Sequence, residues 1–262
     1  MRNIQLLIQY DGTRYKGWQS QNNTEQTIQG RLTKVLERML GEAIELQGSG
    51  RTDAGVHAAG QVANFRTMTP LSCDELLRDI NQFLPEDMAV TEVREADLRF
   101  HSRLHALRKT YVYRIWNSSV SNVFERKYLY QVKEPLDVTA MKQAAALLCG
   151  THDFRAFCAN KRMKKSTVRT LEHIEIERYG QELRLSFTGN GFLYHMVRIM
   201  VGTLLEVGLG KRRWEEMPQL LETGECACSG VLAPAQGLCL LRVEYKDGEA
   251  FRSGRAYHGG RL

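Results

Sequence analysis

With 262 residues, the chain is long enough for one large domain or two ordinary ones. Apolar residues make up 43% and charged residues 25%, which is typical of a folded globular protein and excludes a largely disordered chain. No apolar run approaches the roughly 18 residues of a membrane span, and no apolar signal region follows the first Met, so we expect a cytoplasmic protein. The 36 Lys and Arg residues outnumber the 30 Asp and Glu residues, which favours a polyanionic partner, although many enzymes of small molecules are equally basic.

The first half of the chain contains both strand and helix patterns. Apolar residues from Ile28 to Leu40 recur on one stripe at helical spacing, which predicts a helix that packs with one face. Ser72, with Glu75 three residues later, has the pattern of a capping box and predicts the start of a second helix, which Pro85 ends. Strand patterns flank these helices at residues 4–10, 88–95 and 108–116.

The second half contains the same kinds of element. Helices are expected over residues 138–149, after Asp137, and from about Tyr194 to Val207. Strand patterns lie near 171–178, 183–188 and 238–245. Strands and helices mix without regular alternation, which favours the α+β class with helices on one face of a sheet.

The similarity of the two halves indicates two related lobes that share a cleft. We expect these α+β lobes at residues 1–107 and 108–246. Residues 247–262 are rich in Gly and Arg and poor in apolar residues, so we expect a basic, loosely ordered tail.

The six cysteines carry no recognisable metal-binding pattern. The pair in Cys226-Ala-Cys228 has neither a second pair nor a nearby His to complete a site. We therefore expect reduced thiols that pack as small apolar groups. The cysteines are Cys73, Cys149, Cys158, Cys226, Cys228 and Cys239.

Residues 48–57 form the segment with the clearest chemical character. Three glycines within eight residues forbid a regular helix or strand and predict a tight loop. Asp53 lies in the middle of this loop, two residues after Arg51. The residues alone leave two interpretations open: a polar turn in which Asp53 bonds to its own backbone, or a carboxylate held rigidly at a cleft and kept ionised by a guanidinium.

The string GRTDAGVHA, followed by Gln61-Val62-Ala63-Asn64-Phe65, resembles the signature of the tRNA pseudouridine synthase A family. The resemblance runs in order from residue 10 to about 245. At Ser102 the chain departs from the family, which has alanine there. Further segments that resemble family motifs lie at 10–21 (YDG…YKGWQ-x-Q), 100–103 (FHSR), 109–113 (KTYVY), 150–154 (GTHDF), 192–198 (FLYHMVR) and 233–238 (APAQGL).

The resemblance implies a pseudouridine synthase fold, with mainly antiparallel sheet in both lobes and a basic cleft. It implies an isomerase that detaches uracil from C1′ within RNA and rejoins it through C5. Neither a cofactor nor a metal is implied, and the chain has no P-loop and no G-x-G-x-x-G string. The implied substrate is the tRNA anticodon stem-loop, at uridines 38–40, and the implied assembly is a homodimer with no membrane or DNA partner.

The resemblance also assigns roles to single residues. Asp53 matches the indispensable carboxylate, and Arg198 matches the basic residue that pairs with it. Tyr111 matches the tyrosine that stacks on the target base, and Arg51 matches a residue that takes the place of the extruded nucleotide. Three of them also have a plain structural interpretation: a polar turn for Asp53, a surface arginine at a helix start for Arg198, and a tyrosine on a half-buried strand for Tyr111.

Several further residues are candidates for RNA contact. His57 either orients the loop or meets a phosphate. A basic run, Lys161, Arg162, Lys164 and Lys165, indicates a phosphate-contacting loop or a solvated face, and Lys211-Arg212-Arg213 is similar. The apolar stripe over 197–205 is core or, by the resemblance, part of a subunit interface. His101 and His105 lie in strand-like surroundings and lack a third metal ligand.

Three alternatives to a tRNA-modifying enzyme remain at this stage. A member of the same family with another RNA substrate, such as ribosomal RNA, would keep the chemistry. An RNA-binding module without activity would have lost Asp53, Tyr111 or Arg198, and none is lost. An enzyme of small molecules with Asp53 as nucleophile is disfavoured by the basic run.

Overall fold

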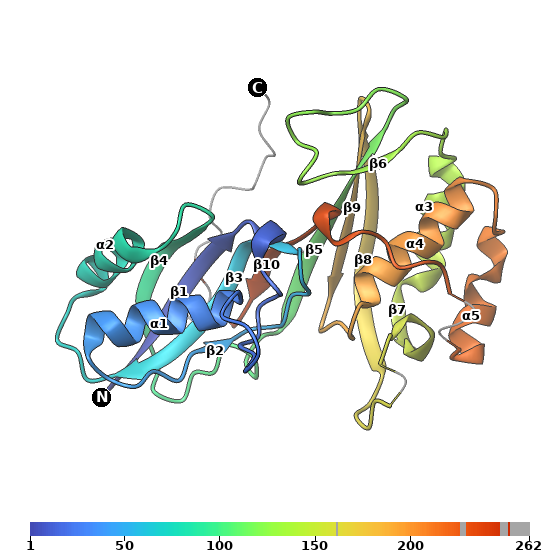
Figure 1. Ribbon diagram of the computed structural model, residues 1–262. Helices are drawn as coiled ribbons and strands as arrows, with labels where there is room; N and C mark the ends of the chain where they lie inside the picture. Colours follow the sequence, from blue (N-terminus) through green and yellow to red (C-terminus); the bar gives the residue numbers. More distant parts are fainter. Residues whose placement is uncertain (161, 226–228, 247–250, 252–262) are drawn as a thin grey trace. The chain divides into compact units, whose positions relative to one another are not determined.

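The computed structural model describes residues 1–160, 162–225, 229–246 and 251, and the chain divides into two compact units. The first unit contains residues 1–107 together with the described residues from 239 on, and the second contains residues 108–238. The last strand differs from the prediction, because it groups with the first unit and not with the second. Figure 1 shows strands and helices in both units.

The sheet of the first unit is built around β1 (Arg2–Tyr10) and β3 (His57–Thr67). Its strand order is β4-β1-β3-β10, and the short β2 also pairs with β3. All of these pairings are antiparallel except that of β10 with β3, which is parallel. The remaining strands are β2 (Gln47–Gly48), β4 (Met88–Ala96) and β10 (Leu238–Glu244).

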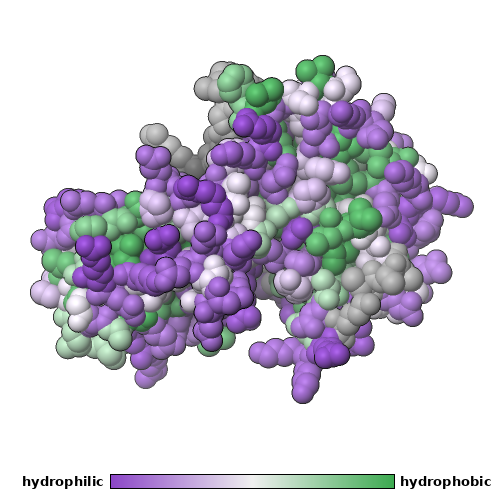
Figure 2. All heavy atoms as spheres, in the orientation of Figure 1, coloured by the Kyte–Doolittle hydropathy of each residue, from purple (hydrophilic) through white to green (hydrophobic). Residues whose placement is uncertain are grey.

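Helix α1 (Ile28–Leu40) packs on this sheet through the apolar stripe that its sequence predicts. Ile28, Leu32 and Leu36 are fully buried, whereas the basic residues Arg31, Lys34 and Arg38 are exposed. Figure 2 shows mostly hydrophilic residues on the visible surface of this unit. The side chain of Thr27 accepts a hydrogen bond from the Gly30 N–H and so caps the helix.

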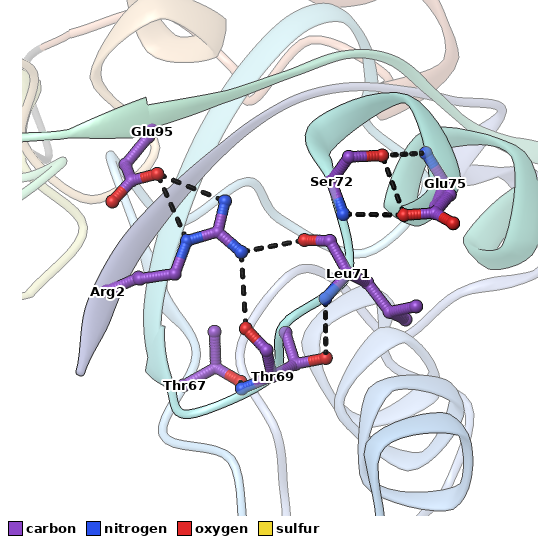
Figure 3. Close-up of polar contacts among 7 residues, drawn as sticks. All are labelled: Arg2, Thr67, Thr69, Leu71, Ser72, Glu75 and Glu95. Carbon is purple, nitrogen blue, oxygen red and sulfur yellow. Dashed lines mark hydrogen bonds and ion pairs between the residues drawn. The ribbon is translucent and has the colours of Figure 1, made fainter.

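Helix α2 (Cys73–Phe83) begins with the capping box that the sequence predicts. The Ser72 hydroxyl accepts the Glu75 N–H, and the Glu75 carboxylate accepts the Ser72 N–H in return (Figure 3). The segment before the helix is tied to β1, because Arg2 donates to the Leu71 carbonyl at 2.7 Å. These contacts fix the helix start against the sheet.

The second unit contains a sheet in the order β5-β9-β8-β7, with antiparallel pairing throughout, and β6 joins β5 in parallel. The apolar residues Leu183, Leu185 and Phe187 alternate on β9 and are fully buried. The strands are β5 (Arg108–Asn117), β6 (Tyr130–Val132), β7 (Gly150–Asp153), β8 (Val168–Tyr179) and β9 (Glu182–Gly189). The strand pairings within the two units confirm the predicted α+β class with mainly antiparallel strands.

The helices of the second unit are α3 (Val138–Leu148), α4 (Met196–Gly208) and α5 (Met217–Thr223). Helix α4 is buried along most of its length, so its apolar stripe over 197–205 is core of this unit. Gly202 allows a close approach, since a Cβ there would lie 1.7 Å from the Val231 carbonyl oxygen. Among the described residues, no helix combines the length and apolar character that crossing a bilayer needs.

Other differences from the prediction concern the elements without a strong local pattern. Strand β3 is not predicted as a strand, and neither are β2, β6 and β7. The predicted strand-like surroundings of His101 and His105 are wrong, because these residues lie in a turn closed by the His105 N–H on the His101 carbonyl. Short 3-10 turns occur at 12–14, 155–157, 214–216 and 235–237.

Candidate functional site

The loop that carries Asp53 leaves the sheet after β2 and returns to it at β3. Residues 47 and 48 pair with 64 and 63, and the Ser49 N–H adds a hydrogen bond to the Val62 carbonyl at 2.7 Å. Asp53 is half-buried, between the buried Thr52 and the exposed Ala54. The ladder therefore fixes both ends of the loop and presents the carboxylate near the surface.

Buried polar side chains hold the loop from the inside. The Thr52 hydroxyl lies 2.8 Å from the hydroxyl of Tyr10, the last residue of β1. The Gln61 side chain accepts from the Ser49 hydroxyl at 2.6 Å and donates to the Gly50 carbonyl at 3.0 Å. Because Gln61 and Ser49 are fully buried, these bonds are shielded from water and make the loop rigid.

The segment over residues 12–18 packs directly against the loop. The Trp18 N–H donates to the Thr52 carbonyl at 3.0 Å. A Cβ at Gly12 would lie 2.0 Å from the Val56 carbonyl oxygen, and one at Gly17 would lie 2.7 Å from the Thr52 carbonyl oxygen. Glycine at these two positions is what lets the two backbones touch.

Arg51 is exposed, and a chain of glutamines orients its guanidinium. Its Nε donates to Oε1 of Gln19 at 2.9 Å. The amide of Gln19 donates to Oε1 of Gln29 at 2.7 Å, and Gln29 donates to the Leu46 carbonyl at 2.8 Å. No local sequence pattern indicates a role for Gln19 or Gln29, because these hydrogen bonds join separate segments of the chain.

His57 is buried at the start of β3. Its Nδ1 accepts the Gly12 N–H at 3.0 Å and lies 3.2 Å from a carboxylate oxygen of Asp11. Burial and these contacts favour the interpretation that His57 orients the loop over contact with a phosphate.

In the second unit, Tyr111 lies on β5 and is buried to 7% exposure. The ring of Phe192 meets it edge to face, with ring centroids 5.1 Å apart. The neighbouring Thr110 hydroxyl lies 2.9 Å from that of Thr188 on β9. Phe192 thus limits the orientation of the Tyr111 ring, a role that the sequence motif alone does not reveal.

Arg198 lies in the first turn of α4 and is half-buried. Its Nε donates to the Ala233 carbonyl at 2.8 Å, and the Ala233 N–H donates to the Arg198 carbonyl at 3.2 Å. Farther along the helix, the Gly230 N–H donates to the Thr203 hydroxyl at 2.9 Å. The segment over 230–234 therefore holds the stem of Arg198 in place.

The two basic runs differ in their surroundings. Arg162, Lys164 and Lys165 are exposed, and no carboxylate in the described part of the chain pairs with them. Arg212 and Arg213, in contrast, pair with acidic side chains of the same unit: Glu206, Glu215 and Glu216. The run at 162–165 is therefore the better candidate for phosphate contact. Lys161, Cys226 and Cys228 lie outside the described residues.

The structure thus groups Arg51, Asp53 and His57 in one braced loop of the first unit, and places Tyr111 and Arg198 in the second. Over the described residues, no group of three or more His, Cys, Asp or Glu side chains could hold a metal ion. The arrangement in the first unit offers one carboxylate on a rigid backbone with an oriented guanidinium two residues away.

The comparisons with known proteins agree with one another and cover nearly the whole length of this chain. The family described as tRNA pseudouridine synthase matches residues 6–104 and 144–246, which include Arg51, Asp53 and Arg198. A tRNA pseudouridine synthase A 2 of Bacillus cereus is 46% identical over 245 residues, covering 94% of this chain and 100% of the relative. The tRNA pseudouridine synthases A of Acetivibrio thermocellus and of a Bacillus species are 43% and 46% identical with the same coverage.

Proposed function

Because the chain belongs to the tRNA pseudouridine synthase family, we propose that it isomerises uridines 38–40 in the anticodon stem-loop of tRNA, with Asp53 as the catalytic carboxylate. The observation that carries this proposal is the braced loop around Asp53. The loop is bonded to β3 and to Tyr10, and is packed against the glycines of the segment before α1. A catalytic group needs such support, because its position must be held before the substrate arrives.

The reaction conserves every atom of the nucleoside. The bond from C1′ to N1 breaks, a bond from C1′ to C5 forms, C5 loses its proton and N1 gains one. Nothing is oxidised or reduced and no group leaves the RNA, so the chemistry requires neither a redox cofactor nor a group donor. The ionised Asp53 is the nucleophile or electrostatic partner in this exchange.

The target base must leave the RNA stack before Asp53 can reach it, which costs a few kcal/mol. Arg51 is exposed and oriented by Gln19, so its planar guanidinium is suited to enter the vacated position and contact phosphates. In the second unit, we assign Tyr111 to stacking on the target base and Arg198 to binding the substrate. We further propose that the protein acts as a homodimer in the cytoplasm.

The test is a site-resolved map of pseudouridine in a tRNA transcript treated with the purified chain. We expect modification at uridines 38–40 with the wild type and none with Asp53→Asn, while the affinity for the RNA is retained. Asp74→Asn, which changes an exposed carboxylate in the first turn of α2, serves as the matched control and should modify normally. Thermal melting checks that both variants fold.

Two outcomes would contradict the proposal in different ways. Full activity of Asp53→Ala would show that the reaction does not need this carboxylate. Modification confined to another RNA, with anticodon uridines untouched, would keep the chemistry and overturn the substrate.

A further inference from the structure

An aromatic pair lies on the surface of the second unit just before α4. The rings of Tyr194 and His195 stack with centroids 3.7 Å apart and an interplanar angle of 27°. Tyr194 is still 55% exposed, so its ring retains area for a second flat partner. The His195 backbone has φ 63°, in the left-handed region that residues other than glycine rarely adopt.

A backbone hydrogen bond joins the aromatic pair to the segment that leads into the candidate phosphate-contacting run. The Ala159 N–H donates to the Tyr194 carbonyl at 3.1 Å, and the Arg162 N–H donates to the Asn160 side chain at 3.1 Å. The stack therefore lies at the base of the loop that displays Arg162, Lys164 and Lys165. A flat aromatic surface beside unpaired positive charge is the combination that binds unpaired nucleotides, since bases stack and phosphates attract cations.

The pair also lies close along the chain to the residue that orients Tyr111. Phe192 is two positions before Tyr194, so their Cα atoms are at most roughly 7 Å apart, and Phe192 contacts the Tyr111 ring. Leu193 between them is buried, which anchors the segment in the core. One short stretch of backbone thus connects the proposed target-base stack with an exposed aromatic surface.

We propose that Tyr194 and His195 form a stacking platform for an unpaired base of the RNA loop next to the target uridine, whose phosphates meet the run at 162–165. This inference rests on the proposed function and adds a second base contact to it. RNA loops are read in this way by proteins, because unpaired bases expose their flat faces to aromatic side chains. The platform extends recognition beyond the uridine that reacts.

The first measurement is the steady-state kinetics of three variants on an anticodon stem-loop. Tyr194→Ala should raise KM about 5- to 100-fold, which is the range of one lost base stack, and leave kcat unchanged. Tyr194→Phe should retain the wild-type KM, because the flat face remains. Tyr179→Ala is the matched control and should behave as wild type, since Tyr179 is an equally exposed tyrosine (49%) of the same unit, beneath the Arg184 guanidinium.

The second measurement reports stacking itself. A stem-loop carrying 2-aminopurine at a loop position next to the target uridine is bound to the Asp53→Asn protein, and its fluorescence should be quenched. The quenching should be lost with Asp53→Asn combined with Tyr194→Ala or with Tyr194→Leu, which keeps apolar bulk without a π face. Unchanged KM and unchanged quenching in these variants would overturn the platform.

The outcomes separate this inference from the proposed function. If the wild type forms pseudouridine in the stem-loop and the Tyr194 variants match it in KM and quenching, only the platform fails. If the wild type forms none while quenching depends on Tyr194, only the proposed function fails. A change in oligomeric state of Tyr194→Ala with unaltered RNA affinity would identify a protein-docking surface and overturn the platform.

Discussion

The hydroxyl of Tyr10 at the end of β1 and that of Thr52, the residue before Asp53, lie 2.8 Å apart, and both side chains are buried. This contact joins the central strand of the first unit to the loop that presents the candidate catalytic carboxylate. Gln61 lies alongside, with its amide 3.5 Å from the Tyr10 hydroxyl. The position of Asp53 therefore depends on core residues that never reach the substrate.

Removing the Tyr10 hydroxyl should lower both the catalytic rate and the stability. Tyr10→Phe deletes the short hydrogen bond to Thr52 and the longer one from Gln61, so we expect a loss of about 1 to 2 kcal/mol in the free energy of unfolding and a fall in kcat of about 5- to 10-fold. The affinity for RNA should not change, because no phosphate contact is lost. Urea unfolding and single-turnover kinetics measure these quantities, and Tyr179→Phe, which removes an exposed tyrosine hydroxyl, is the control. An unaltered kcat would show that the loop does not need this support.

The sequence predicts the elements whose signals are local. The capping box at Ser72 and Glu75 forms as its spacing indicates, because both bonds lie within one helical turn. No local pattern predicts strand β3, because Gly60, Gln61 and Asn64 interrupt any apolar alternation. Its stability comes from pairing with β1 and β10, which lie far away in the sequence. The grouping of β10 with the first unit has the same cause, because no local pattern indicates that this strand pairs with β3.

The candidate site likewise contains residues that the sequence predicts and contacts that it does not. Asp53 and Arg51 follow from the motif, because family resemblance is read from consecutive letters. The contacts that support them, from Gln19 to Arg51 and from Phe192 to Tyr111, join separate segments and become visible only in three dimensions. Close packing at Gly17 is of this kind too, since the sequence shows a glycine but not the backbone that touches it.

Gly17 offers a test of that close packing. Its φ is 98°, and a Cβ would lie 2.7 Å from the Thr52 carbonyl oxygen. Gly17→Ala should therefore displace the backbone beside Asp53, with a fall in kcat of up to about a hundredfold. Gly41→Ala is the matched control, because Gly41 also has a positive φ, 68°, but no atom within 4 Å of the added Cβ. It should cost only the backbone strain, about 1 to 2 kcal/mol by urea unfolding, and keep full activity. Equal activities of the two variants would contradict the packing argument.

The basic run at 162–165 should contribute affinity without selecting a base. In Lys164→Gln combined with Lys165→Gln, the affinity for RNA should fall. The slope of log affinity against log salt concentration should become shallower by about 1 to 2, because fewer counterions are released on binding when phosphate contacts are lost. The double change Lys133→Gln with Lys142→Gln removes two exposed lysines elsewhere in the same unit and should leave the slope as it is. Binding titrations between low and moderate salt measure both slopes. Equal slopes for the two double variants would make residues 164 and 165 an ordinary solvated face.

We expect a buried ion-pair network in the second unit to make the stability of this unit sensitive to acid. Arg114 on β5 is 4% exposed and donates to both carboxylate oxygens of Glu182, at 2.7 and 3.1 Å, and to Glu125 at 3.0 Å. Burial alone raises the pKa of Glu182, but the hydrogen bonds from Arg114 and Arg184 outweigh it and hold that pKa below the usual 4.5. Because the pKa is lower in the folded state, the stabilisation is fully present above pH 4.5 and is lost as the pH falls through the folded value.

Glu182→Gln should therefore weaken the second unit at neutral pH and reduce its sensitivity to acid. Removing one charge of a buried pair leaves Arg114 undercompensated, so we expect a loss of about 3 kcal/mol in the free energy of unfolding at pH 7. The gap between wild type and variant should narrow as the pH falls below 4.5, because the wild type then loses the same interaction. Glu175→Gln, on the exposed side of β8, is the control and should follow the wild-type curve. Urea unfolding from about pH 7 to about pH 3 gives the three curves, and a gap that stays constant over this range would show that Glu182 does not govern the response to acid.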